Sequence, residues 1–143
     1  MARILIAEDE AALREFISRA LTYHGHEVVT VNDGADALVT LQKGRPFDLL
    51  LTDIVMPVMD GIALALKVSK DLPDLRILMM TGYAAERQRA YNLDMLIHDV
   101  IAKPFTLDEI CEKVNEALTS DRSPLRPATT SDEGLQRQKR DKG

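Results

Sequence analysis

The sequence has very little cysteine, since Cys111 is the only one among its 143 residues. A single cysteine excludes an internal disulfide and any zinc or iron–sulfur centre that needs several cysteines. The chain also lacks an uninterrupted apolar run approaching the roughly 20 residues that cross a bilayer. Residues 1–7 are few and lead directly into acidic residues, which is unlike a signal peptide. These absences predict a protein of the reducing cytoplasm that does not enter membranes.

An excess of positive charge is missing as well. The formal net charge is −5 and the sequence pI is about 5.2, which argues against a protein held on nucleic acid by a basic face. Residues 119–143 hold six basic and four acidic residues, which leaves 12 basic and 19 acidic residues in 1–118. The segment 119–143 is too polar to offset its chain entropy by burial. We therefore predict one folded domain over residues 1–118 and a disordered C-terminal tail over 119–143.

Within residues 1–118, short apolar runs alternate with helical patterns. The runs are typical of strands covered on both faces of a parallel sheet, and they span residues 4–7, 28–31, 47–51, 77–80 and 100–102. Between them, apolar residues recur at helical spacing, and Phe16 and Phe105 are expected in the core. Thr106 followed by Glu109 predicts a capping box at the start of the last helix. The alternation predicts a doubly wound α/β sandwich with right-handed crossovers.

Charged and hydroxyl side chains follow these runs, at the edge where such folds bind ligands. The acidic run 8–10 follows the first strand, Asp53 the third, Thr81 the fourth and Lys103 the fifth. Clustered carboxylates repel one another and favour a hard divalent cation, so Mg²⁺ is the expected cofactor. A carboxylate beside such an ion can attack a phosphoryl donor, while a lysine and a hydroxyl hold the phosphoryl oxygens.

The order and spacing of these residues resemble the receiver domain of two-component response regulators, over about residues 2–118. The matching elements are Glu8-Asp9, Asp53 with Met56-Pro57 and Asp60-Gly61, Thr81-Gly82, and Lys103-Pro104-Phe105. The intervals of 44, 28 and 22 residues from Asp9 through Asp53 and Thr81 to Lys103 suit that family. The resemblance implies a CheY-like, flavodoxin-like (βα)5 fold with a parallel sheet in the order 2-1-3-4-5 and helices on both faces.

The same resemblance implies roles for individual residues. Asp53 is the phosphoacceptor and a Mg²⁺ ligand, Asp9 binds the ion directly, Glu8 acts through water, and the backbone carbonyl of Val55 completes the protein ligands. Beyond phosphorylating and dephosphorylating itself, such a protein is not an enzyme.

The resemblance also implies how a phosphoryl group on Asp53 is sensed. Thr81 turns toward it and Lys103 pairs with it, with a cis peptide before Pro104. Many receivers place a switch aromatic three positions before this lysine, but here that position is Val100. We expect Tyr83 to take over the switch role. Apolar bulk at Val55 and Tyr83, beside the path of an attacking water, predicts slow loss of the phosphoryl group.

A closer resemblance, carried by residues 2–10, 80–84 and 97–105, is to a group of stand-alone receivers of alphaproteobacteria. It implies a histidine phosphotransferase, fed by a hybrid histidine kinase, as the phosphodonor. It further implies that the unphosphorylated protein binds the ClpX unfoldase and acts as an adaptor of the ClpXP protease in cell-cycle control. Phosphorylation switches this off. A cytoplasmic monomer or weak dimer is expected, with recruitment to a cell pole as one option.

Three alternative functions share part of this residue pattern. A receiver with another partner, such as a phosphate shuttle or a flagellar-motor regulator, has the same core. A phosphatase of the haloacid dehalogenase type also uses an aspartyl nucleophile, but it needs an acid where Val55 stands. A nucleotide-binding flavodoxin-like module needs a glycine loop after the first strand, which is missing.

Asp60-Gly61 is best explained as a turn and helix start, and Thr81 has a simpler alternative role as a helix cap.

Overall fold

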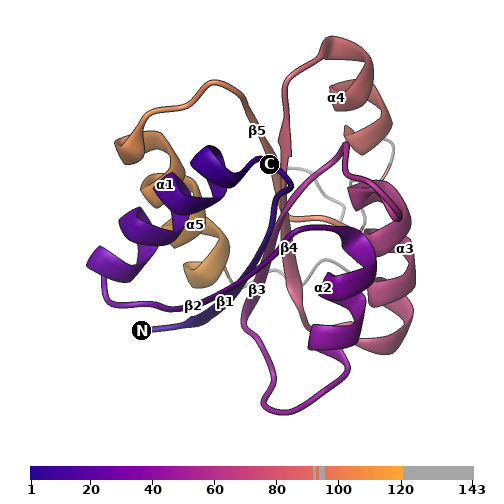
Figure 1. The fold of residues 1–143 in the computed structure, drawn as a ribbon, viewed down its shortest axis with the longest axis horizontal. Coiled ribbons are helices and arrows are strands. Elements are labelled where there is room, and N and C mark those ends of the chain that lie inside the picture. Colours follow the sequence, from indigo (N-terminus) through magenta and orange to yellow (C-terminus); the bar gives the residue numbers. More distant parts are fainter. Residues whose placement is uncertain (92, 94–95, 121–143) are drawn as a thin grey trace, which may run out of the picture.

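The structure, a computed structural model, describes residues 1–91, 93 and 96–120, in which strands and helices alternate strictly (Figure 1). The strands are β1 (Arg3–Ala7), β2 (Glu27–Val31), β3 (Leu49–Asp53), β4 (Arg76–Thr81) and β5 (Asp99–Ala102). The helices are α1 (Ala11–Tyr23), α2 (Gly34–Leu41), α3 (Gly61–Asp71), α4 (Ala84–Tyr91) and α5 (Leu107–Thr119).

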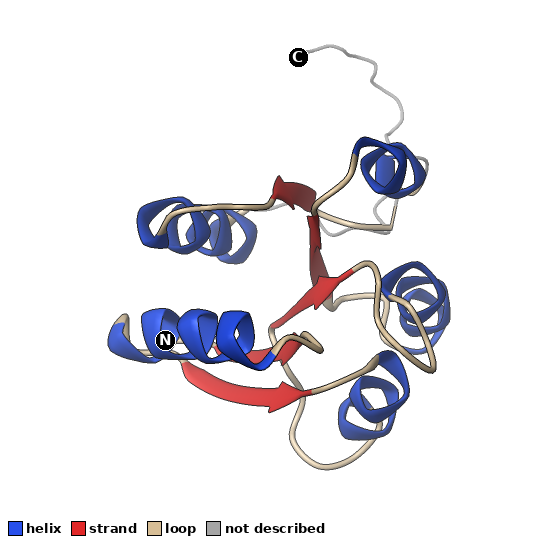
Figure 2. Ribbon diagram, turned by 45° about the horizontal axis from the view of Figure 1, so that its top comes forward, coloured by secondary structure: helices blue, strands red, loops and turns tan. Residues whose placement is uncertain are grey.

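The five strands form one parallel sheet in the order β2-β1-β3-β4-β5. Helices α1 and α5 cover one face, and α2, α3 and α4 cover the other (Figure 2). The predicted doubly wound α/β fold and its strand order are therefore confirmed. Because all strands run the same way, their carboxyl ends meet at one edge of the sheet.

Alternation along the strands divides the core into two layers. Ile4 and Ile6 of β1 pack with the apolar sides of α1 and α5, while Leu5 points to the opposite layer with α2 and α3. The central strand β3 is buried over its whole length. A strand covered on both faces needs the continuous apolar run that the sequence shows. Because this strand is packed on both sides, the position of Asp53 at its end is closely restricted.

Two predicted positions differ in the structure. The strand expected from Phe47 begins only at Leu49. Phe47 is buried in the core layer of α2 and α3, and the Arg3 guanidinium also stacks 4.0 Å from its ring centre. Phe16 is 38% exposed rather than in the core, since its side chain lines an open cleft. Phe105 is partly buried against the α1–α5 layer.

The last helix begins and ends close to its predicted limits. The Thr106 hydroxyl accepts a hydrogen bond from the Glu109 N–H at 3.1 Å, and the Glu109 carboxylate accepts one from the Thr106 N–H at 2.7 Å, which confirms the capping box. Helix α5 includes Thr119, the first residue of the predicted tail. Residues 121–143, where the rest of that predicted disordered tail falls, lie outside the described residues. None of the described helices is long and apolar enough to cross a membrane.

Candidate phosphorylation site

Four strands deliver the predicted site residues to one edge of the sheet. Glu8 and Asp9 directly follow β1, Asp53 is the last residue of β3, and Thr81 is the last residue of β4. Lys103 directly follows β5, and its N–H donates to the Thr81 carbonyl at 2.7 Å. Because β1, β3, β4 and β5 are consecutive neighbours in the sheet, these side chains become spatial neighbours as well.

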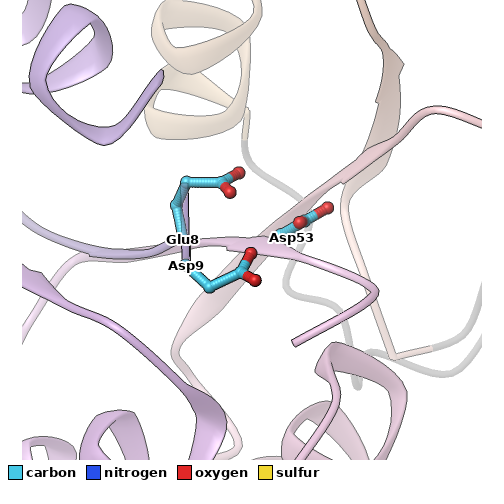
Figure 3. A group of neighbouring side chains, drawn as sticks. All are labelled: Glu8, Asp9 and Asp53. Atoms are coloured by element: carbon cyan, nitrogen blue, oxygen red, sulfur yellow. The ribbon is translucent and has the colours of Figure 1, made fainter. Parts of the chain in front are cut away.

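The three carboxylates converge on one small space. Glu8, Asp9 and Asp53 each offer an oxygen within 4.8 Å of the others (Figure 3). Glu8 is fully buried and Asp53 is 5% exposed, whereas Asp9 faces solvent. Three like charges at this separation repel strongly when two of them are removed from water. An oxygen-only donor set of this kind fits a hard divalent cation such as Mg²⁺, which retains several waters.

Lys103 partly compensates this negative charge. Its Nζ lies 3.0 Å from Asp53 Oδ1 and 3.2 Å from Glu8 Oε1. Burial raises the pKa of Asp53, against the opposing hydrogen bond and charge of Lys103, and the nearby Asp9 carboxylate raises it further. Burial and the Asp53 charge likewise raise the pKa of Glu8, against its hydrogen bond from the Glu10 N–H and against Lys103.

At Lys103, burial affects the pKa less than the neighbouring carboxylates together do. Burial alone would lower this pKa, but the hydrogen bond and charge of Asp53, together with Glu8, raise it above the usual lysine value. The lysine therefore remains charged at neutral pH and holds the Asp53 carboxylate in place.

Backbone contacts fix the orientation of Asp53. The Ile54 N–H donates to Asp53 Oδ1 at 2.9 Å, which leaves the other carboxylate oxygen without a backbone donor in the described contacts. The loop that follows closes on itself, because the Gly61 N–H donates to the Ile54 carbonyl at 2.7 Å. Gly61 passes so near that a methyl group on it would overlap the Asp53 carbonyl oxygen. Asp60 caps α3 by accepting from the Ala63 N–H at 2.8 Å, in agreement with the predicted helix start.

Thr81 is fully buried, and its hydroxyl points toward α4. Thr81 Oγ1 lies 3.1 Å from both the Tyr83 carbonyl oxygen and Glu86 Oε1. The Tyr83 side chain is 70% exposed, while Val100, at the usual switch position, is buried in β5. In the structure, the Thr81 hydroxyl thus faces α4, and the aromatic ring of Tyr83 lies on the surface.

A cleft of about 660 Å³ opens over Asp53. Its walls include the apolar side chains of Phe16 and Val55 and the charged side chains of Lys103 and Glu86. Val55 is 53% exposed, which places apolar bulk beside the carboxylate. The Lys103–Pro104 peptide bond is cis.

The structure adds two residues to the site that the sequence pattern does not predict. The pattern indicates Gly61 only as a turn residue, although it also forms the close contact behind Asp53. Glu86 has only a weak signal in the sequence, an acid in the first turn of the helix that follows Thr81.

A parallel sheet in this order, with carboxylates and a lysine gathered at its carboxyl edge, defines the receiver class of signalling domain. The chain belongs to the response regulator receiver domain family, whose model matches residues 4–115. Members of this family are signalling proteins rather than metabolic enzymes, and they bind Mg²⁺ at an acidic pocket.

The chain matches some relatives along nearly their whole length and others along only part of it. The chain is 42% identical over 118 residues to the response regulator receiver protein CpdR of Brucella abortus, covering 82% of this chain and 98% of that protein. It is 34% identical over 116 residues to the response regulator MprA of Mycobacterium leprae, of which it spans about half (50%), and 81% of this chain is covered. The predicted resemblance to a group of stand-alone alphaproteobacterial receivers, to which CpdR belongs, is thus confirmed at the level of the sequence.

Solved structures show the same fold. The response regulator TrrA of Thermotoga maritima, determined in complex with Mg²⁺ and BeF, is 32% identical with a TM-score of 0.74, covering 82% of this chain and 100% of that one. A CheY-like receiver domain protein of Methanospirillum hungatei is 30% identical with a TM-score of 0.76, covering 82% and 94%.

Proposed function

We propose that Asp53 accepts a phosphoryl group and that the protein signals through the change this causes. The observation that carries the proposal is the buried Asp53 carboxylate, held 3.0 Å from Lys103 Nζ and within 4.8 Å of the Glu8 and Asp9 oxygens. A carboxylate placed in this way can attack phosphorus, while the lysine ammonium follows the negative charge onto the phosphoryl oxygens.

The proposal includes a Mg²⁺ ion at the carboxylate cluster, which supplies an oxygen-only donor set. As the family resemblance implies, Asp9 and Asp53 would bind the ion directly, Glu8 would act through water, and the Val55 backbone carbonyl would complete the protein ligands. When bound, the ion neutralises charge on the phosphoryl oxygens. The chain's own residues do the rest: Asp53 provides the nucleophilic oxygen, Lys103 pairs with the transferred group, and the Thr81 hydroxyl donates to it after turning from α4.

The phosphodonor in this proposal is a histidine phosphotransferase fed by a hybrid histidine kinase. The phosphoryl group of phosphohistidine is transferred to the Asp53 oxygen: the O–P bond forms, the P–N bond breaks, and the imidazole is the leaving group. The apolar walls at Val55 and Tyr83 hinder an attacking water, so the phosphorylated protein is expected to be long-lived. A half-life of seconds would argue against this role of the two side chains.

The output in this proposal is protein–protein contact, with the ClpX unfoldase of ClpXP as the partner and phosphorylation as the inhibitory signal. Support comes from the 42% identity to CpdR along 98% of that relative. A phosphate shuttle or motor-type regulator is the competing function, since it would use the same Asp53 chemistry. A cytoplasmic location, with or without recruitment to a cell pole, and a monomer or weak dimer belong to the same proposal.

A pull-down with purified ClpX tests this output. We compare the wild type, Asp53→Ala, and both proteins treated with beryllofluoride and Mg²⁺. The adaptor role predicts binding by both untreated proteins and loss of binding only in the treated wild type. If no state binds ClpX while beryllofluoride still changes the wild-type spectrum, the receiver chemistry stands and the ClpX assignment is wrong.

The coupling role of Tyr83 is tested separately. Tyr83→Ala is expected to leave phosphorylation of Asp53 intact and to abolish the effect of phosphorylation on partner binding. The exposed position of this side chain makes a folding defect from the substitution small. Phosphorylation-dependent binding at the wild-type level in Tyr83→Ala would rule out the switch role.

A further inference from the structure

The described side chains of helix α4, those of residues 85–90, make few apolar contacts with the rest of the fold. Among its residues whose side chains are described, only Ala90 is buried. The described middle of the helix is polar, with Glu86, Arg87, Gln88 and Arg89 in succession. An element with so little buried apolar surface can move at low energetic cost. Over residues 85–90, the contacts that can hold the helix in position are therefore mainly polar.

Two described side-chain contacts link α4 to the edge that carries Asp53. Arg89 Nη2 lies 3.3 Å from Asp60 Oδ2, but both side chains are substantially exposed, so this ion pair contributes little. The Glu86 carboxylate accepts from the hydroxyl of Thr81, which is fully buried, at 3.1 Å. A hydrogen bond from a buried hydroxyl to a carboxylate is stronger than an exposed ion pair. Glu86 is thus the firmer of the two attachments.

The Thr81 hydroxyl has a single proton to donate. In the structure this proton is shared between the Tyr83 carbonyl and Glu86 Oε1, each 3.1 Å from Thr81 Oγ1. A hydroxyl that donates to Glu86 cannot also donate to a phosphoryl oxygen on Asp53. In addition, Glu86 and Asp53 line the same cleft, so extra negative charge on Asp53 repels the Glu86 carboxylate.

We propose that Glu86 is a positioning residue that holds the Thr81 hydroxyl in its resting orientation toward α4. This inference rests on the proposed phosphorylation of Asp53 and names how that site is regulated. Phosphorylation breaks the Thr81–Glu86 hydrogen bond, and α4, deprived of its main polar attachment, is free to shift. The strength of the Glu86 bond, added to that of the bond to the Tyr83 carbonyl, then opposes entry into the phosphorylated conformation.

The test is a titration of the full chain with beryllofluoride in excess Mg²⁺, followed by the amide NMR signals of Thr81 and Gly82. Glu86→Ala removes one of the two acceptors that hold the hydroxyl in its resting orientation, so the half-saturating concentration of beryllofluoride is expected to fall about fivefold. Glu86→Gln keeps an acceptor but removes the charge, and an intermediate decrease is expected. Gln88→Ala is the matched control, because Gln88 is exposed on the same helix, and its value is expected to equal that of the wild type.

A double-mutant cycle separates positioning from a general effect on the helix. In a Thr81→Val background the hydroxyl is absent, so Glu86→Ala is expected to leave the half-saturating concentration unchanged. An equal decrease in both backgrounds, or no decrease in the Glu86 variants, would refute the role of Glu86 while leaving a working receiver. No response of the wild type to beryllofluoride would refute phosphorylation at Asp53, and with it this inference.

Discussion

Replacing Gly61 by alanine tests how Asp53 is positioned. Gly61 begins α3 and crosses the carboxyl end of β3, where its N–H donates to the Ile54 carbonyl at 2.7 Å. A methyl group there would overlap the Asp53 carbonyl oxygen and lie 3.1 Å from the Ile54 Cα. The three nearest atoms all belong to the backbone, so rotation of a side chain cannot relieve the overlap.

The size of the effect follows from this geometry. To relieve the overlap, the α3 start and the end of β3 must separate by about 1 Å in a close-packed region. Overpacking of this kind lowers the free energy of unfolding by about 1 to 3 kcal/mol. If Asp53 moves with the backbone, a misplacement of about 1 Å is expected to slow its phosphorylation by on the order of 100-fold.

Urea unfolding followed by circular dichroism measures the first effect, and the initial rate of phosphorylation by acetyl phosphate with Mg²⁺ measures the second. Gly82→Ala is the control, since a methyl group there meets no atom within 4 Å. We expect Gly82→Ala to unfold at the wild-type urea concentration. If Gly61→Ala also matched the wild type in stability and rate, the close contact behind Asp53 would not position the carboxylate.

Three further results are expected. Lys103→Met leaves the Asp53 and Glu8 carboxylates without their shared cation, so in the absence of Mg²⁺ the free energy of unfolding falls by about 2 to 3 kcal/mol; an unchanged urea midpoint would contradict the ion pairs. Because burial raises the pKa of Glu8, the folded protein binds more protons than the unfolded chain between the usual carboxyl pKa and the raised value, and stability from this group is lost as the pH rises through that window. The pKa of His26 is lowered chiefly by burial, so this group changes stability with pH in the opposite direction. The wild type is therefore compared with Glu8→Gln in urea titrations without Mg²⁺. The free energy of unfolding of Glu8→Gln is expected to fall less as the pH rises. Val58 has a φ of 71°, and its side chain is 84% exposed. Because asparagine adopts this left-handed conformation more readily than valine, Val58→Asn is expected to raise the free energy of unfolding by about 1 kcal/mol in thermal or urea unfolding. A decrease would show that the valine side chain makes a stabilising contact.

The sequence predicts the architecture well because burial on both faces leaves a strong signal. The continuous apolar run before Asp53 can occupy only a covered central strand, and the alternation of such runs with helical patterns leads to one fold class. Strand limits are harder to predict, since Phe47 is buried in the core and contacts Arg3 from a distant part of the chain without being part of the strand. Nothing in the local pattern around Phe47 distinguishes that contact from strand pairing.

At the site, the sequence places residues at strand ends but does not give their orientations. That Lys103 contacts both Asp53 and Glu8 follows from strand order and from the neutralisation of like charges. The contact between Thr81 and Glu86 depends instead on how the short turn through Gly82 and Tyr83 directs α4. Such a turn has several conformations of similar energy, so it could not be derived from residue types alone.

All the proposed chemistry lies at the carboxyl ends of the strands, whereas the loop 42–48 enters β3 from its other end (Figure 1). Lys43 in that loop is exposed, and the neighbouring Gly44 is surrounded by open space. A sensor chip or a fluorescent dye attached through Lys43→Cys, with Cys111→Ser to remove the native thiol, would thus be carried on the far side from the acidic pocket. Molecules immobilised in this way would all present Asp53 to solution, so that binding partners could be screened with the protein in one defined orientation.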